Sequence, residues 1–276
     1  MALTNFIPEL WAARLLENLE NAHVATLFVN RDYEGDIKKM GDTVHINSLG
    51  KISVKDYTVN GKIEDPEVLS TEDQTLVIDQ AKYFNFYVDD VEKVQAAGPV
   101  MDKAMQSAAY EIADVVDKAI FAAMAKDAKT KLNKTVNKGN IYDALIELRT
   151  AMNKLNVPKT GRRLACSSDV TGLILRDERL IKATETGQER ATNGFIGRLA
   201  GFDIYETENV PANTIVAGST IGTSFAEQIT EVKAYEPENR FAEAVKGLNV
   251  YGIKVVEPKA VATIKYTIKE DATPAA

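Results

Sequence analysis

The sequence predicts an α+β fold, and three features of its patterning lead to this prediction. Runs of alternating apolar and polar residues, typical of strands, lie near both ends of the chain. One long helical pattern covers about residues 99–129, and the second half mixes helical and strand-like segments without a regular βαβ alternation. A chain of 276 residues with 45% hydrophobic and 26% charged residues has room for one large or two small globular domains.

The first predicted element is an amphipathic helix over residues 4–20. Thr4 or Asn5 can cap it, and Pro8 suits its first turn. Its apolar stripe consists of Leu10, Trp11, Leu15, Leu16 and Leu19. This stripe needs a surface to pack on, and the surface is either the chain's own body or a neighbouring copy.

Two long strand-like runs follow, Thr43–Tyr57 and Thr75–Val88, and the second ends in aromatic residues. The polar stretch between them contains Asn60-Gly61 and is typical of an open turn. A two-stranded arm is at best marginally stable alone in water, and each strand could reach about 40 Å at about 3.3 Å per residue. The runs have no apparent core of their own. We therefore expect the arm to be held from outside, by a second copy of the same protein.

The strongest helical pattern runs from about Pro99 to Lys129, which corresponds to about 45 Å of helix. Asp102, Asp114 and Asp117 lie outside its apolar stripe, and its high alanine content suits a helix that lies flat across a sheet. The residues of the predicted stripe are Met101, Met105, Ala108, Ile112, Val115, Ala119 and Met124.

The rest of the chain alternates irregularly between predicted elements. The polar residues 130–140 are interpreted as a linker or an exposed hairpin. Helices are expected at 141–155, ending before Pro158, and from Ser168 or Asp169 to Leu175. Strands are expected at 164–167, 202–206, 214–217, 229–235, 248–256 and 260–268.

Composition excludes several classes of protein. No stretch approaches the roughly twenty apolar residues of a membrane helix, so no membrane partner is expected. The single cysteine, Cys166, excludes an internal disulfide and is interpreted as an inert core thiol in a reducing compartment. A net charge of −7 argues against a broad basic face that grips nucleic acid.

The search for catalytic, cofactor-binding and metal-binding residues yields none. His23 and His45 have no carboxylate or cysteine nearby at ligand spacing, so they are interpreted as solvated or packed histidines. Asp89-Asp90 is interpreted as a polar junction that caps the following helix rather than as an acid–base pair. No Gly-x-Ser-x-Gly nucleophile turn is present. The chain is predicted to be structural and not an enzyme.

Two further motifs have ordinary structural interpretations. Gly194, Gly197 and Gly201 match neither a dinucleotide fingerprint nor a phosphate loop, and are expected to form backbone turns before the strand at Phe202. Lys159 with Arg162-Arg163 is interpreted as a solvated turn before a strand rather than as a nucleic-acid contact.

Five stretches of the sequence closely resemble segments of one protein family. TLVIDQAKYFNFYVDDVEKVQA resembles the return strand of an extended loop and its entry into a long spine helix. The others are MALTNFIPELWAARLLENL, NRDYEGDIKKMGDTVHI, NGFIGRLAGFDIYETENVP and VKGLNVYGIKVVEPKAVATI. Together they cover essentially the whole chain. The sequence thus resembles the major capsid (coat) proteins of tailed bacteriophages, which have the Hong Kong 97 type fold, also called the Johnson fold.

The resemblance implies a division of labour along the chain. Residues 1–37 would be an N-terminal arm and residues 38–87 an extended β-hairpin loop. Residues 88–134 would form the peripheral domain with its spine helix, residues 135–230 the axial domain, and residues 231–276 the C-terminal strands that return to the peripheral domain. Arms without support of their own are understandable when each lies across a neighbouring subunit.

The implied function is self-assembly into the pentamers and hexamers of an icosahedral shell around double-stranded DNA. The implied location is the virion, after assembly in the cytoplasm of the host bacterium. The chain begins close to the N-terminal arm, so the resemblance implies an uncleaved coat and a separate scaffolding protein. Further implied partners are a portal protein, a possible decoration protein, and packaged DNA contacted weakly and without sequence specificity; no cofactor is implied.

Eight residues are predicted to make assembly contacts: Phe6, Trp11, Leu15, Lys55, Tyr57, Asn60, Gly61 and Lys62. The founding member of the family cross-links its subunits between a loop lysine and an asparagine near the C-terminal strands. Lys55 and Lys62 are possible donors here, but Ala244 lies where the asparagine is expected. Covalent cross-links between subunits are therefore not expected.

Two other functions remain open at this point. An encapsulin-type nanocompartment has the same fold but encloses cargo enzymes, and such proteins usually lack the KYFNFYVDD pattern found here. A soluble enzyme with an oligomerisation arm is a more remote alternative, because no catalytic constellation is visible. Shells seen by electron microscopy would separate the enzyme from the other two, and a neighbouring terminase or portal gene would separate the capsid from the nanocompartment.

Overall fold

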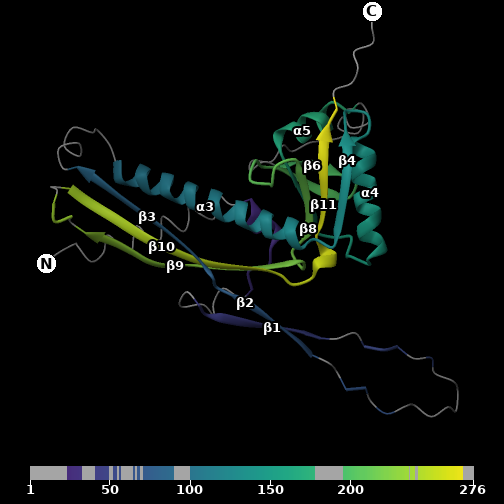
Figure 1. Ribbon diagram of the computed structural model, residues 1–276, viewed down its shortest axis with the longest axis horizontal. Helices are drawn as coiled ribbons and strands as arrows, with labels where there is room; N and C mark the ends of the chain where they lie inside the picture. The colour runs from purple at the N-terminus through teal and green to yellow at the C-terminus, as the bar shows by residue number, and fades with distance from the viewer. Residues whose placement is uncertain are drawn as a thin grey trace, which may run out of the picture.

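The computed structural model describes residues 24–32, 41–49, 71–89, 100–177, 195–235 and 242–269, with short pieces at 52–54, 56, 65, 67–68 and 237–239. Its described part has three regions (Figure 1). A long helix lies along a narrow three-stranded sheet, a wider six-stranded sheet carries two shorter helices, and a two-stranded arm projects away from both. The α+β prediction is confirmed.

The six-stranded sheet has the order β4-β11-β8-β5-β7-β6. It is mixed, because β11 pairs in parallel with β4 and β5 pairs in parallel with β7, while the other pairs are antiparallel. The strands are β4 (Thr130–Val136), β5 (Arg162–Cys166), β6 (Phe195–Leu199), β7 (Phe202–Glu206), β8 (Thr214–Ser219) and β11 (Ala262–Ile268). Two helices, α4 (Ile141–Lys154) and α5 (Ser168–Leu175), accompany this sheet.

The largest group of buried residues lies between this sheet and its helices. α4 contributes Leu145, Leu148 and Met152, each essentially inaccessible to water. The strands contribute residues such as Phe202 and Ile264 from the facing side. Because the group closes on itself within one chain, this region has the core of an ordinary globular domain.

The three-stranded sheet has the order β3-β10-β9, and all its pairs are antiparallel. Its strands are β3 (Gln80–Asp89), β9 (Thr223–Tyr235) and β10 (Ala242–Val255). The long helix α3 (Val100–Asp127) lies along this sheet, as Figure 1 shows. No helix among the described residues is long and apolar enough to cross a membrane.

The face that α3 buries differs from the predicted stripe. Met105, Ile112 and Met124 are buried as expected, but Val115 is 40% exposed. The buried set is Met105, Ala109, Ile112, Ala113, Val116, Asp117, Ile120, Phe121 and Met124. Apolar residues lie on both sides of this helix, so their spacing alone did not decide which side faces the sheet.

The third sheet pairs β1 (Thr43–Leu49) with β2 (Thr71–Val77) in antiparallel register, with Thr43 opposite Val77. Two sequence predictions are wrong here. The first run is a strand only as far as Leu49 within the described residues, and the second run is two strands, interrupted at Ile78 and Asp79. Its aromatic end is β3, which belongs to the three-stranded sheet because it pairs with β10.

Two smaller predictions also need correction, and a third agrees with the structure. Residues 130–136, interpreted as a linker or hairpin, form the edge strand β4. Asp89 is the last residue of β3 and does not cap α3, which begins at Val100. Gly197 lies at a bulge and Gly201 in the tight β6–β7 turn, both with positive φ, as expected of turn glycines.

Candidate assembly surface

The base of the β1–β2 arm packs on its own subunit. Val44, Ile46, Leu76 and Ile78 are buried together with Ala226 and Val250 of the three-stranded sheet, and Val256 packs against them. Backbone bonds join Gly41 N to Ile78 O at 2.8 Å and Ile78 N to Asp42 O at 3.0 Å. The expectation that the arm has no core of its own is therefore wrong for its base.

The outer part of the arm is different. Ser53 donates from its backbone N–H and from its hydroxyl to the Glu67 carboxylate, each at 3.1 Å, which joins the two sides of the arm. Ile52, Val54 and Val68 flank this contact and are 68%, 96% and 91% exposed. A valine with almost all of its surface in water gains nothing from folding of the subunit, so a group of three on a projecting arm marks an interaction surface.

A second feature fixes the chain at the point where the described N-terminal residues begin. The carboxylate of Asp117, 1% exposed in α3, accepts hydrogen bonds from the backbone N–H groups of Val24 (2.8 Å) and Ala25 (3.2 Å). The short 3₁₀ helix η2 (Ala25–Phe28) follows, and Phe28 packs edge-on against Phe121 of α3 with ring centroids 5.4 Å apart. Residues 24–28 are therefore held against the spine helix.

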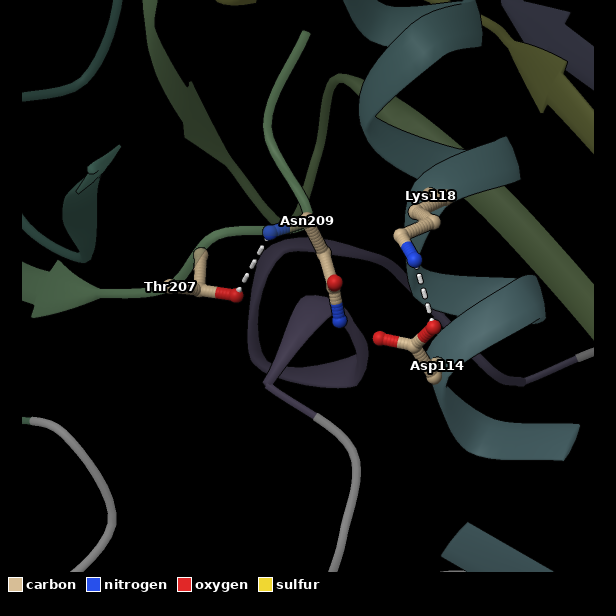
Figure 2. A network of polar contacts seen from close by, with 4 residues as sticks. All are labelled: Asp114, Lys118, Thr207 and Asn209. Atoms are coloured by element: carbon tan, nitrogen blue, oxygen red, sulfur yellow. Dashed lines mark hydrogen bonds and ion pairs between the residues drawn. The ribbon is translucent and has the colours of Figure 1, made fainter. Parts of the chain in front are cut away.

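The loop after β7 lies beside α3 at this point (Figure 2). Asn209 N donates to Thr207 Oγ1 at 3.2 Å, and its side-chain amide points toward Asp114. Asp114 pairs with Lys118 one turn along α3 at 2.5 Å, and this hydrogen bond raises the pKa of the Lys118 ammonium. The first contact shapes the loop after β7 and the second lies within α3, and the two meet where the loop lies beside the helix.

A groove of about 690 Å³ runs between α3 and β3. Six consecutive residues of β3, 82–87, line it, together with residues 104, 107, 108, 111, 112 and 115 of α3. Consecutive strand residues point to opposite faces of a sheet, so the groove follows the free edge of β3 rather than one face. Tyr83 and Tyr87 are 79% and 51% exposed there. Within the described residues this edge of β3 pairs with no other strand, and a strand edge beside apolar side chains is suited to a protein–protein contact.

The structure does not test the predicted contact residues. Phe6, Trp11, Leu15, Lys55, Tyr57, Asn60, Gly61 and Lys62 all lie outside the described residues, as does His23. The prediction also missed Ile52, Val54 and Val68. The alternation of apolar and polar residues in Lys51–Asp56, which places Ile52 and Val54 on one face, was the available signal.

The histidine and cysteine side chains considered from the sequence lie in ordinary structural environments. His45 is not isolated: its Nδ1 lies 2.8 Å from Asp73 Oδ2 across the β1–β2 pair, and both side chains are more than half exposed. Cys166 is buried, and burial raises the pKa of its thiol to about 12, so it is held in the neutral form. No group of three metal-ligating side chains is found among the described residues.

The prediction of a solvated basic turn holds for Lys159, which is exposed before β5, and is wrong for Arg162 and Arg163, which belong to β5. Arg162 is 3% exposed and donates to the carbonyl oxygens of Pro158 (2.7 Å) and Val157 (2.6 Å). Burial lowers the pKa of its guanidinium, which the nearby Arg149 lowers further. Arg163 donates to the carbonyl of Leu27. Arg162 thus ties β5 to the loop before it, and Arg163 ties β5 to η2.

Comparison with known proteins agrees with the arrangement of arm, spine helix and sheets. The family model described as "Phage capsid protein" matches residues 71–264. A solved structure titled Mycobacterium phage Che8 has a TM-score of 0.71 at 28% identity, covering 88% of this chain and 90% of its own. No curated protein matches the sequence.

Two more distant structures share the fold. The capsid of Ralstonia phage GP4 has a TM-score of 0.65 at 12% identity and covers 93% of this chain and 92% of its own. A virus-like particle from Pyrococcus furiosus has a TM-score of 0.57 at 15% identity, over 94% of this chain and 99% of its own.

A projecting arm, a long spine helix across a narrow sheet and a separate mixed sheet define a shell-forming subunit of the Hong Kong 97 type. The chain belongs to the phage capsid protein family, and it is a structural component of the virion.

Proposed function

We propose that this protein is the major capsid protein of a tailed bacteriophage and forms the pentamers and hexamers of an icosahedral shell around double-stranded DNA. The observation that carries the proposal is the arm. Its base is fixed to its own subunit, while Ile52, Val54 and Val68 near its outer part are exposed to water. These side chains become buried when the arm lies on a second copy.

The position of the arm favours a head-to-tail contact between copies. The arm and the α3–β3 groove are different surfaces at different places on the subunit (Figure 1). A contact between two different surfaces is head-to-tail, and it produces a ring when the rotation between copies closes. Pentamers and hexamers are rings of this kind. The boundaries proposed from the sequence, with the extended loop at 38–87 and the axial domain at 135–230, accompany this proposal.

The proposal is tested by electron microscopy of the purified protein with and without residues 55–65. The complete chain is expected to form uniform closed shells, and the deleted chain a folded subunit that assembles poorly. Circular dichroism and the denaturant midpoint serve as the control, because both report only on the subunit. Normal shells from the deleted chain would show that the arm is not an assembly element.

Packaged DNA is expected to contact the shell weakly, since the chain carries a net charge of −7. We propose a separate scaffolding protein, a portal and possibly a decoration protein as further partners, with assembly in the host bacterial cytoplasm and no enzymatic activity.

Ala244 is buried in β10 between Tyr87 and Tyr235, and supports a shell without lysine–asparagine cross-links.

An encapsulin-type compartment is the second candidate. It is favoured by the fold shared with the Pyrococcus furiosus virus-like particle. At 15% identity this likeness concerns the fold alone. Cargo enzymes copurifying with the particles would favour the compartment, and DNA-filled particles would favour the capsid.

A further inference from the structure

Gly252 of β10 lies where the arm joins the body of the subunit. The returning strand β2 ends at Val77, and the chain passes over β10 at Ile78 and Asp79 before β3 begins. A Cβ atom placed on Gly252 would lie closer than 3.0 Å to the carbonyl oxygen of Val77, a distance that real Cβ atoms essentially never show. It would also lie 3.1 Å from the Val77 carbonyl carbon and 2.8 Å from Ile78 Cδ1.

The need for glycine here is steric and not conformational. Gly252 does not have a positive φ, so its backbone conformation is open to other residues. Only the missing side chain lets the backbone of the arm approach β10 this closely. Because the contacted atom is a backbone carbonyl, it cannot move aside by a change of rotamer, and the strand that carries it must move.

A second glycine of the same strand provides the contrast. A Cβ on Gly247 would come equally close to another group, but that group is the ring of Phe84 in β3. Phe84 packs against the α3 side of the sheet, and the arm takes no part in this contact. The two glycines, five positions apart in β10, therefore face different neighbours. Gly247 faces an aromatic ring, and Gly252 faces the backbone at the root of the arm.

Movement at the root is amplified along the arm. To reach the 3.4 Å at which ordinary contact begins, the Val77 carbonyl must move by about 1 Å. The next fixed point on β2 is Gln74, whose side chain donates a hydrogen bond to the carbonyl of Val256 at 3.3 Å. Gln74 lies about 10 Å from Val77, at about 3.3 Å per strand residue. Residue 65, nine positions before Gln74, lies at most about 30 Å from it on the same scale. With Gln74 as the pivot, a shift of about 1 Å at Val77 moves residue 65 by up to about 3 Å, which is enough to break a hydrogen bond.

We propose that Gly252 is a positioning residue for assembly, which sets the direction in which the arm leaves the subunit. This inference rests on the proposed role of the arm in assembly. Gly252 itself makes no contact with another copy under this proposal. It acts through the Val77 carbonyl, and its effect appears at Ile52, Val54 and Val68.

The test compares Gly252→Ala with Gly247→Ala, which places the same methyl group on the same strand against a different neighbour. Spin labels on Asp65→Cys and Thr150→Cys report the distance from the arm to α4, because both positions are exposed and the buried Cys166 is protected from labelling. Gly252→Ala is expected to shift this distance by several ångströms and to lower the yield of closed particles at least tenfold. Gly247→Ala is expected to leave the distance unchanged.

A third variant guards against simple misfolding. Gly252→Ala with Ile78→Val removes the Ile78 Cδ1 atom next to the new methyl group, while the Val77 carbonyl stays displaced. It is expected to melt closer to the wild type and still to show the shifted distance. An unchanged distance in this folded variant would overturn the proposal. If the distance shifts but the wild type forms no particles, the positioning role stands and the proposed function fails.

Discussion

The six-stranded sheet and the β1–β2 arm differ in how much of their apolar surface is buried within the subunit. The sheet closes over α4 and α5, and its core residues, such as Leu148 and Phe202, have no exposed surface. The arm has a small buried group at its base and then extends outward with Val54 96% exposed. One region is complete as a single subunit, and the other leaves apolar side chains in water where the proposed function places a second copy. Stability and assembly are therefore expected to respond to different residues.

Phe202→Ala should have the largest effect on the isolated subunit. The side chain is fully buried among the sheet and helix residues, and truncating a buried phenylalanine costs about 3–5 kcal/mol. Denaturant unfolding of the subunit measures this loss. If the stability of the subunit stayed near the wild-type value, the six-stranded sheet would not be the self-sufficient region described above.

Asp117→Ala should have an intermediate effect. It leaves the N–H groups of Val24 and Ala25 without their acceptor, and a buried donor that loses its partner costs about 1–3 kcal/mol. Hydrogen exchange should show faster exchange at residues 24–30 than elsewhere in the subunit. Asp117→Asn is the matched control, because it keeps an acceptor oxygen in the same place. Equal exchange in both variants would mean that the carboxylate does not hold this segment.

Ile52→Ser combined with Val54→Ser should have the smallest effect on the subunit and a large effect on particles. Exposed positions usually change the free energy of unfolding by no more than about 0.5 kcal/mol. Light scattering during assembly and electron microscopy of the product measure the second effect. Leu175→Ser is the control, since it removes an exposed apolar side chain from the end of α5 instead of from the arm or the α3–β3 groove. The division between the two regions would be lost if the double variant assembled normally.

The sequence allowed the local elements of the self-sufficient region to be predicted well. α4 begins at Ile141 and ends before Pro158, and β7 covers Phe202–Glu206, as the punctuation and the alternation of residues indicate. β4 was missed because an edge strand with lysines and threonines on its open side looks like a polar linker. Its partner, β11, lies near the other end of the chain, so nothing local identifies the pairing.

The same limit explains the errors around the arm. No glycine or proline marks a break at Ile78 and Asp79, although β2 pairs with β1 and β3 pairs with β10. Pattern fixes which side chains share a face, but the partner strand decides to which sheet they belong. Asp117 likewise has its role only because Val24 and Ala25, 93 and 92 positions away, arrive next to it.

The pairing of distant segments also sets the order of events during synthesis. β4 is made early but its neighbour in the sheet, β11, comes last, with Thr130 aligned to Ala262. β3 likewise pairs with β10 only when residues up to Tyr251 exist. Contacts between residues so far apart in sequence make folding slow. The long helix and the arm root must therefore leave the ribosome before the strands that support them, and each new subunit can complete its sheets only once β11 has been made.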